Sequence, residues 1–308
     1  MKFGVREIAN VVFRAKSAVK IGNTNFKVGQ PVLYIDSAKT STLEGAATTV
    51  YAQGGRGNTR LIAWEGEKTL TFTVEDALLS PMGFSILSGA GLIKDESQKV
   101  HVHTTTSAYV GTDGVIDLTD VVGSTGVIET TAPLFVMEVD GSGSLTGTMY
   151  EGATVNGPKI TCTAAAGKSV LVDYYVQKAG SNVSEIQIDA ENFAGYYYVE
   201  ADTLFRRQDN GVDMPANITL PNVKIQSNFT FSMASTGDPS TFTFTMDAFP
   251  GYTYFDSTKK VLCVIQIVED ASADTTVWSS AMAHKEGEKL DMDNDSSTTE
   301  TDSTKEVG

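Results

Sequence analysis

Residues 40–80, TSTLEGAATTVYAQGGRGNTRLIAWEGEKTLTFTVEDALLS, decide the fold of this chain. Strand-like stretches lie on both sides of a glycine-rich turn, and residues 68–74 alternate polar and apolar side chains. Such alternation is typical of a β-strand with one buried face. We therefore expect the turn at 54–58 to join two paired strands, 43–53 and 59–64, because glycine reaches the positive φ angles of tight hairpins.

A distant segment, residues 217–250, shows a similar pattern and is the expected partner of residues 40–80. In it, phenylalanine alternates with threonine or serine at Phe229, Phe231, Phe242 and Phe244. A third stretch, VLCVIQIV at 261–268, is almost continuously apolar. An uninterrupted apolar run of this length is typical of a strand that is covered on both faces, so we expect it to be the most buried strand.

One short helix is expected after the first of these segments. Ser80 is a favourable N-cap, Pro81 suits the first helical turn, and Gly89 is a favourable C-terminal stop. The rest of the chain is rich in threonine and serine and reads as strands and turns. The expected fold class is therefore mainly β.

The composition of the 308-residue chain restricts its function. It is 41% hydrophobic and 20% charged, as in a folded globular protein, and its formal net charge is −15. So many carboxylates oppose binding to nucleic acid, which depends on Lys and Arg contacts to phosphate. No apolar run is long enough to span a bilayer, and we expect no membrane association.

Changes in composition suggest four regions. We expect a β core at 1–123 and again at 181–270, because long alternating strands occur in both. Between them, residues 124–180 carry short strands at intervals of about ten residues, which indicates an inserted small β hairpin or sandwich domain. Residues 271–308 are polar and acidic and are expected to form a flexible C-terminal arm.

No motif in the sequence gives strong evidence for a metal site or a catalytic site. Cys162 and Cys263 lie in apolar strands without metal-binding spacing, and we expect two buried free thiols. His101 and His103 lie on one face of a strand but have no third ligand in the sequence nearby. An Asp-x-Asp-x-Asp motif at 291–295 lacks the glycine and the final glutamate of a calcium loop. We therefore expect no metal site, no cofactor and no enzymatic activity.

Four stretches carry a resemblance to a known family: LEGAATTVYAQGG at 43–55, RLIAWEGEKTLTF at 60–72, ITLPNVKIQSNFTF at 218–231 and DAFP at 247–250. Together they resemble the tail tube (major tail) proteins of long-tailed bacteriophages. The resemblance covers about half of the chain, in two blocks that flank the segment 124–180. It rests on patterns of strands and not on a catalytic motif.

This resemblance implies a β-sandwich or barrel-type core that assembles into stacked, hexameric rings around a DNA channel. DNA then passes through the tube without specific binding, and loops and terminal arms reach the neighbouring rings. The implied partners are further copies of the chain and other tail proteins such as sheath, tape measure or tail terminator. The implied location is the tail of the virion, after synthesis in the host cytoplasm. The segment 124–180 is expected to face outward.

Candidate assembly residues follow from the same resemblance. The expected subunit contacts are Arg56, Arg60, Trp64, Tyr196, Tyr197 and Tyr198. The expected channel wall contains the carboxylates Glu65, Glu67 and Asp247, which flank the strands that resemble barrel strands. A cationic wall would hold DNA by releasing counterions, whereas an acidic wall repels it.

Two other kinds of protein fit the same sequence. The first is a phage capsid decoration protein or a neck or tail-completion protein, which would also be a β-rich virion subunit. The second is a carbohydrate-binding β-sandwich adhesin in which Trp64 and the tyrosines at 196–198 form a sugar platform. A ring with a pore in electron micrographs would favour the tube, whereas binding to glycans would favour the adhesin.

Overall fold

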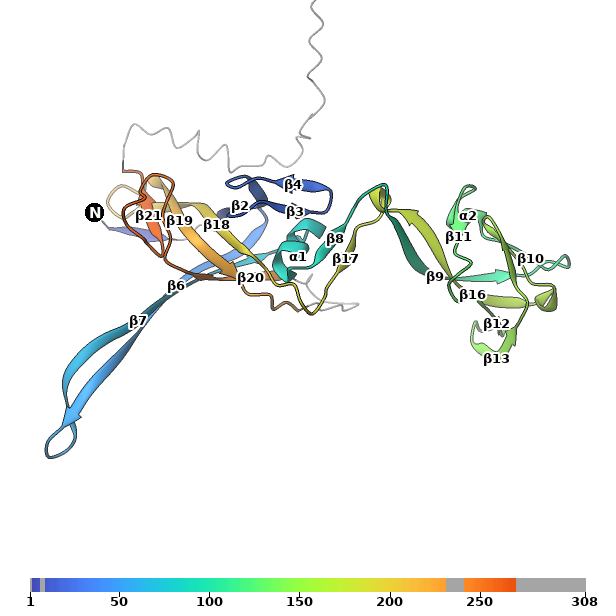
Figure 1. The fold of residues 1–308 in the computed structure, drawn as a ribbon, viewed down its shortest axis with the longest axis horizontal. Helices are drawn as coiled ribbons and strands as arrows, with labels where there is room; N and C mark the ends of the chain where they lie inside the picture. The colour runs from blue at the N-terminus through green and yellow to red at the C-terminus, as the bar shows by residue number, and fades with distance from the viewer. Residues whose placement is uncertain (1, 6–8, 231–240, 270–308) are drawn as a thin grey trace, which may run out of the picture.

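The computed structural model of the chain describes residues 2–5, 9–230 and 241–269. Figure 1 shows a central body, a long hairpin that leaves it on one side, and a smaller strand-rich part on the other side. Most of the described residues lie in strands, which form several sheets, so the expected mainly β fold is confirmed. The expected acidic arm at 271–308 lies outside the described residues.

The body is built on a nine-stranded antiparallel sheet with the order β5-β2-β18-β19-β20-β7-β6, to which β1 adds on β18 and β21 on β19. The strand bounds are β1 Phe3–Val5, β2 Asn10–Ala15, β5 Pro31–Ile35, β6 Ala38–Gly54, β7 Thr59–Asp76, β18 Tyr196–Arg207, β19 Asp213–Ile225, β20 Phe242–Ala248 and β21 Val264–Ile267. In this sheet β7 pairs with β20, with Phe244 opposite Val74. The predicted pairing of residues 40–80 with residues 217–250 is therefore confirmed.

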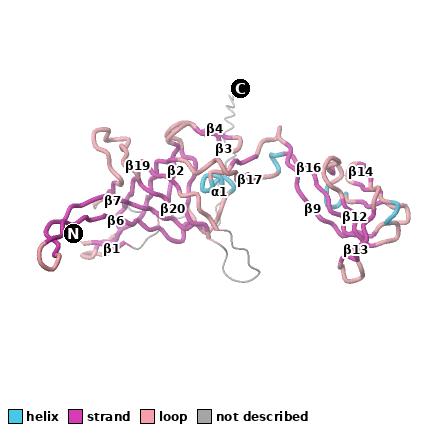
Figure 2. Tube along the Cα trace, turned by 60° about the horizontal axis from the view of Figure 1, so that its bottom comes forward, coloured by secondary structure: helices cyan, strands magenta, loops and turns pink. Residues whose placement is uncertain are grey.

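The sheet of the body curves around its own hydrophobic core. Strands β2 and β20 are separated by β18 and β19, so a flat sheet would place them roughly 14 Å apart, three strand spacings. Yet the rings of Phe13 on β2 and Phe244 on β20 lie 5.9 Å apart, and Phe13 also contacts Tyr197 at 6.1 Å. Figure 2 shows the strands of the body from a second direction. This curvature places one face of the central strands β2, β18, β19 and β20 in the core and turns their other face outward.

Two expectations about burial were wrong. The apolar run at 261–268 forms only the short strand β21, and its Ile265 is 52% exposed. Among the described residues β21 pairs with β19 alone, so it is an edge strand whose composition reflects β propensity and not burial. Phe229 lies in no strand, because β19 ends at Ile225; its ring instead contacts Phe84. Phe231 lies outside the described residues.

The expected helix is confirmed as α1, Pro81–Ser88. Ser80 caps it by accepting a hydrogen bond from the backbone N–H of Gly83 at 2.9 Å. Gly89 ends it with a φ of 74°, the left-handed conformation that glycine adopts most easily. One face of the helix packs on the core of the body through Ile86 and Leu87.

Gly89→Ala is expected to destabilise the body by at least about 2 kcal/mol, because the left-handed φ is strained in alanine. A Cβ atom there would also meet the backbone of Phe193 at 2.3 Å, so that segment would have to move. Urea unfolding followed by fluorescence measures the loss.

Gly91→Ala is the matched control for this substitution. Gly91 lies two residues further on, and a Cβ atom there would have no neighbour within 4 Å. The same loss of stability in both variants would contradict the proposed role of Gly89.

The smaller part of the structure, here called the module, lies between β9 (Lys99–Tyr109) and β16 (Ser169–Ala179). A five-stranded sheet and a three-stranded sheet enclose its separate core, which includes Ile116, Val136 and Tyr174. The other elements are β10 Val115–Asp117, α2 Thr119–Val122, β11 Val127–Ile128, β12 Phe135–Val139, β13 Leu145–Tyr150, β14 Thr154–Asn156, β15 Lys159–Thr161 and the 3-10 turn Thr163–Ala165. The division of the chain at 1–123, 124–180, 181–270 and 271–308 stays a prediction.

Two small hairpin-like sheets and a turn complete the description. Strands β3 (Val19–Ile21) and β4 (Thr24–Phe26) pair beside the body. Strands β8 (Gly91–Ile93) and β17 (Glu185–Gln187) pair between the body and the module, and a 3-10 turn lies at Gly180–Asn182. No helix within the described ranges is long and apolar enough to cross a bilayer.

The two histidines of the module each face a separate carboxylate. His101 Nε2 lies 3.1 Å from Glu129 Oε2, and His103 Nε2 lies 2.9 Å from Asp173 Oδ1. Hydrogen bonds, first of all from the backbone N–H of Thr131, lower the pKa of Glu129 to about 2. The described part of the chain brings no three His, Cys, Asp or Glu side chains together in a cluster able to hold a metal ion.

Both cysteines are free thiols and belong to different parts of the structure. Cys162 is buried in the core of the module. Cys263 packs at the margin of the core of the body, where burial raises the pKa of its thiol to about 11. The expectation of free thiols is confirmed, although Cys263 is only partly buried.

Candidate assembly site

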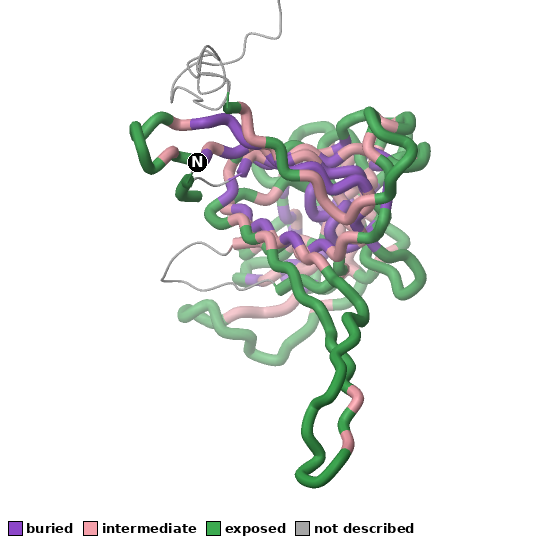
Figure 3. Tube along the Cα trace, turned by 90° about the vertical axis from the view of Figure 1, so that its left-hand side faces the viewer, coloured by how far each residue is buried: buried purple, intermediate pink, exposed green. Residues whose placement is uncertain are grey.

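The most exposed element of the body is the hairpin of β6 and β7, whose outer half has both faces in solvent (Figure 3). The two strands pair along their length and end with Gly54 opposite Thr59. In the turn, Gly55 has a φ of 79°, which glycine adopts without strain. The predicted turn at 54–58 between two paired strands is therefore confirmed.

Large apolar side chains gather on the outer half of this hairpin. We call them the hairpin patch: Val50, Tyr51, Leu61, Ile62 and Trp64. Leu61 is 65% exposed and Trp64 is 53% exposed, and none of the five belongs to a core cluster of the described residues. Val50 lies directly opposite Trp64, so their side chains share one face of the hairpin. Tyr51 lies opposite Ala63 and so points to the other face, which leaves both faces of the hairpin with exposed apolar side chains. Gathered exposed apolar side chains of this kind mark a contact site.

Three predicted contact residues lie on this hairpin. Arg56 is exposed in the turn at the tip. The guanidinium of Arg60 lies 4.0 Å from the centre of the Tyr51 ring, a cation–π contact that orders both side chains. Trp64 lies on β7 within the hairpin patch. The structure therefore brings Arg60 and Trp64 together with the apolar surface and leaves Arg56 beyond it.

The three predicted tyrosines lie on β18, in the body, and differ in their surroundings. Tyr196 is exposed, and its ring contacts Phe249 at 5.8 Å. Tyr197 is buried in the core, and burial raises its pKa to about 12. Tyr198 is buried against Tyr254, with ring centres 4.3 Å apart. Of the three, Tyr196 is the residue whose side chain reaches the surface, and none of them lies beside the hairpin patch.

A β-bulge decides where the predicted wall carboxylates point. Strand β7 has two residues, Gly66 and Glu67, where β6 has only Thr48. The backbone N–H of Glu67 donates to Thr48 Oγ1 at 2.9 Å. Because a bulge shifts the alternation of the strand by one residue, Glu65 and Glu67 lie on opposite faces of the hairpin.

One outward face of the sheet collects carboxylates from three strands. Its members, here called the acidic face, are Glu44 on β6, Glu67 and Glu75 on β7, and Asp247 on β20. Asp247 accepts hydrogen bonds from Gln226 Nε2 at 2.9 Å and from Thr71 Oγ1 at 3.4 Å. Hydrogen bonds from Thr241 and Thr40 hold the pKa of Glu75 below its usual range. Glu75 is thus ionised at neutral pH.

The comparison with family models decides the classification. A model described as the YomU/Tube protein family matches residues 16–267, which is most of the chain. The chain belongs to the YomU/Tube protein family. No curated protein matches the sequence. Membership in this family indicates that the chain is a tube-like structural protein of a phage virion. The mainly β fold agrees with this classification.

The matched range of this YomU/Tube protein contains every surface described above. The hairpin patch lies on β6 and β7, the acidic face lies on β6, β7 and β20, and both fall within the matched residues. Sequence reasoning missed six residues of these surfaces: Val50, Tyr51, Leu61, Ile62, Glu44 and Glu75. A signal was present for two of them, because Leu61 and Ile62 follow directly on the polar turn residues 56–60. The sequence did not reveal that the outer half of the hairpin extends away from the body.

Proposed function

We propose that this YomU/Tube protein is the subunit of a phage tail tube, in which rings, most simply of six copies, stack around a DNA channel. The single observation that carries the proposal is the long hairpin with apolar side chains exposed on both faces. An apolar surface that a subunit cannot cover by itself is stable in water only when a neighbour covers it. In the proposed tube, the hairpin patch packs on the next ring.

The size of this contact is adequate for assembly. Completing the burial of five apolar side chains that are about half exposed contributes roughly 4–6 kcal/mol per hairpin before the cost of association. A ring presents several hairpins to its neighbour at once. Contacts that act together raise the effective concentration of the remaining ones, so modest individual contacts give stable stacks.

The acidic face is the proposed wall of the channel. It contains Glu67 and Asp247, which the sequence predicts for the channel wall, together with Glu44 and Glu75. The bulge turns Glu65, the third predicted wall residue, to the other face of the hairpin. A wall of carboxylates repels the phosphates of DNA, and the repulsion acts over a Debye length of about 8–10 Å. DNA would then pass without being held. The edges of β5, β6 and β21 that pair with no other described strand would be covered in a closed ring.

The module and the predicted contact residues also have proposed roles in the tube. The module extends away from the body on the side opposite to the hairpin (Figure 1), which suits an outward-facing addition to the tube. Arg56 and Arg60 at the hairpin and Tyr196 on the body are proposed contacts between subunits. The proposed partners are other copies of the chain and, at the ends or around the tube, sheath, tape measure or terminator proteins of the virion tail.

Negative-stain electron microscopy of the concentrated full chain tests this function. We expect rings with a central pore that stack into tubes of constant width. A monodisperse monomer at high concentration, with no tubes after prolonged incubation, would contradict the proposal. Closed oligomers without stacking would instead indicate a decoration, neck or tail-completion protein.

A further inference from the structure

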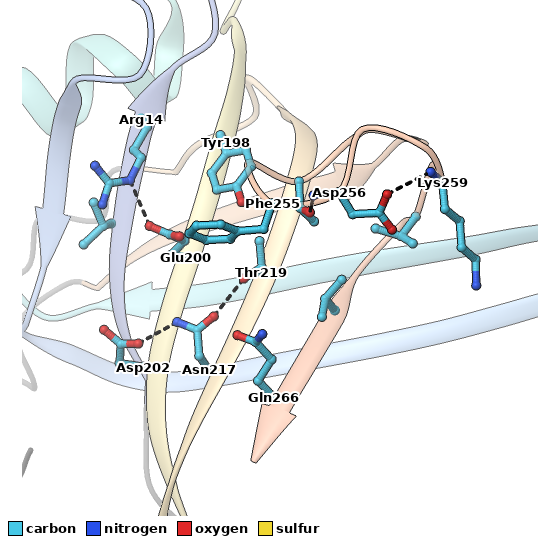
Figure 4. A pocket seen from close by; sticks show the side chains of 14 residues that line it. Arg14, Tyr198, Glu200, Asp202, Asn217, Thr219, Phe255, Asp256, Lys259 and Gln266 are labelled. Atoms are coloured by element: carbon cyan, nitrogen blue, oxygen red, sulfur yellow. Dashed lines mark hydrogen bonds and ion pairs between the residues drawn. The ribbon is translucent and has the colours of Figure 1, made fainter. Parts of the chain in front are cut away.

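A cavity of about 570 Å³ opens on the outward face of β2, β18, β19 and β21 (Figure 4). The other face of β2, β18 and β19 fills the core, so the floor of the cavity consists of the alternate, outward side chains. The segment 251–261, which precedes β21, forms its wall. This volume lies in the range of small-molecule sites. Neither the hairpin patch nor the acidic face contributes to it.

The floor of the cavity is polar and ordered by its own hydrogen bonds. Arg14 Nε donates to Glu200 Oε2 at 2.8 Å. Asn217 Nδ2 donates to Asp202 Oδ1 at 2.6 Å, and Thr219 Oγ1 donates to the other side of the same amide at 2.8 Å. These contacts fix the direction of each planar group. Donors and acceptors therefore face the cavity in a set pattern, which is the arrangement that confers specificity on a binding site.

The wall is a loop that is pinned at several points. Backbone hydrogen bonds between Gly251 and Val261 close its base. Tyr254 packs its ring against Tyr198 of the sheet. Asp256 Oδ1 accepts a hydrogen bond from the backbone N–H of Thr258 at 2.8 Å. The loop therefore holds a defined shape over the floor.

This loop presents one aromatic side chain to the cavity. Phe255 is 97% exposed, although Tyr254 before it is anchored on the sheet. Phe255 and Glu200 both line the cavity, and Figure 4 draws the ring across the strands of the floor. A phenylalanine with almost all of its surface in water contributes little to folding. Its position as part of a cavity wall is explained by a ligand that covers the ring.

The charges and the aromatic ring together define the ligand class. Arg14 and Lys259 face three carboxylates, Glu200, Asp202 and Asp256, so the lining is nearly neutral. A phosphate would meet the carboxylates and a metal ion would meet the guanidinium. A neutral polyhydroxylated ligand avoids both conflicts, since its hydroxyls donate to carboxylates and accept from guanidinium and amide groups. Its apolar C–H face can lie on an aromatic ring.

We propose that this cavity binds a saccharide of one or two rings, which stacks on Phe255 and hydrogen-bonds to Glu200 and Gln266. Gln266 lies on β21 at the border of the floor and adds a planar amide with one donor side and one acceptor side. The site does not depend on tube assembly, because all of its lining residues come from one copy of the chain.

Saturation-transfer NMR on the full chain tests the proposal, because the method works on free subunits and on assemblies. The probes are maltose, cellobiose and N,N′-diacetylchitobiose, each at about 10 mM, which reveals Kd values in the millimolar range. We expect transfer to the sugar C–H protons of at least one probe. Phe255→Ala is expected to weaken its binding about tenfold, the typical effect of losing an aromatic contact and its buried area.

Phe193→Ala is the matched control, because Phe193 is also an exposed phenylalanine of the body but does not line this cavity. It should bind the probe as the unchanged chain does. Gln266→Ala should weaken binding without changing the unfolding midpoint. Absence of transfer to all three probes, or equal transfer in Phe255→Ala, would overturn the proposal. Loss of ring assembly in Phe255→Ala with unchanged sugar binding would overturn it too and would make the loop a subunit contact.

Discussion

A chain with both Leu61→Asp and Ile62→Asp is expected to fold normally but to lose the stacking of its rings. Both side chains are mostly exposed on the outer half of the hairpin, so the isolated subunit loses no core contact. In a contact that excludes water, each buried carboxylate costs several kcal/mol. We expect stacking to weaken by at least about 4 kcal/mol per hairpin, roughly a thousandfold. Sedimentation velocity and electron microscopy measure the loss.

The control for this variant adds the same charge elsewhere. Ser107→Asp with Ser169→Asp places two carboxylates on exposed positions of the module, far along the chain from the hairpin. This variant should still form tubes if charge alone is not the cause. Urea unfolding of both variants should stay within about 0.5 kcal/mol of the unchanged chain. Normal stacks from the hairpin variant would remove the main support for the proposed function.

Elements with strong local signals could be predicted from the sequence. Helix α1 begins at Pro81 after the cap Ser80 and ends at Gly89, as the residue types at these positions require. The turn at 54–58 was predictable for the same reason, because its glycines permit positive φ angles. Even the long-range pairing of β7 with β20 followed from two matching alternations with one apolar face each.

Features that depend on partners far along the chain could not be predicted. The run at 261–268 is as apolar as a central strand, yet β21 lies at an edge because its only described partner is β19. Tyr197 is buried because its side chain enters the core of the body, and Tyr198 is buried because Tyr254 of a distant loop packs on it; their sequence context reveals neither. Glu65 was separated from Glu67 by a single extra residue in β7. A bulge of one residue inverts every inference about faces beyond it.

The deepest loss of stability is expected from Phe244→Ala. Phe244 is 1% exposed, lies on the strand that joins β19 to β7, and contacts Phe13 across the core. Its removal leaves a cavity where two sections of the curved sheet meet, and such changes cost about 3–5 kcal/mol. We expect a lower urea midpoint for the body. Because β20 pairs with β7, the base of the hairpin should also become less ordered, and hydrogen exchange along Thr71–Asp76 should become faster.

The comparison with Phe135→Ala makes this last result specific. Phe135 is 46% exposed on β12 of the module, so the same change of residue there should cost less than about 1 kcal/mol. The core of the module contains no residue of the body's core cluster. Phe244→Ala should therefore leave hydrogen exchange along β9 and β16 unchanged while it speeds exchange at β7. Equal acceleration in both places would mean that the two cores unfold as one unit, and that the module does not fold independently of the body.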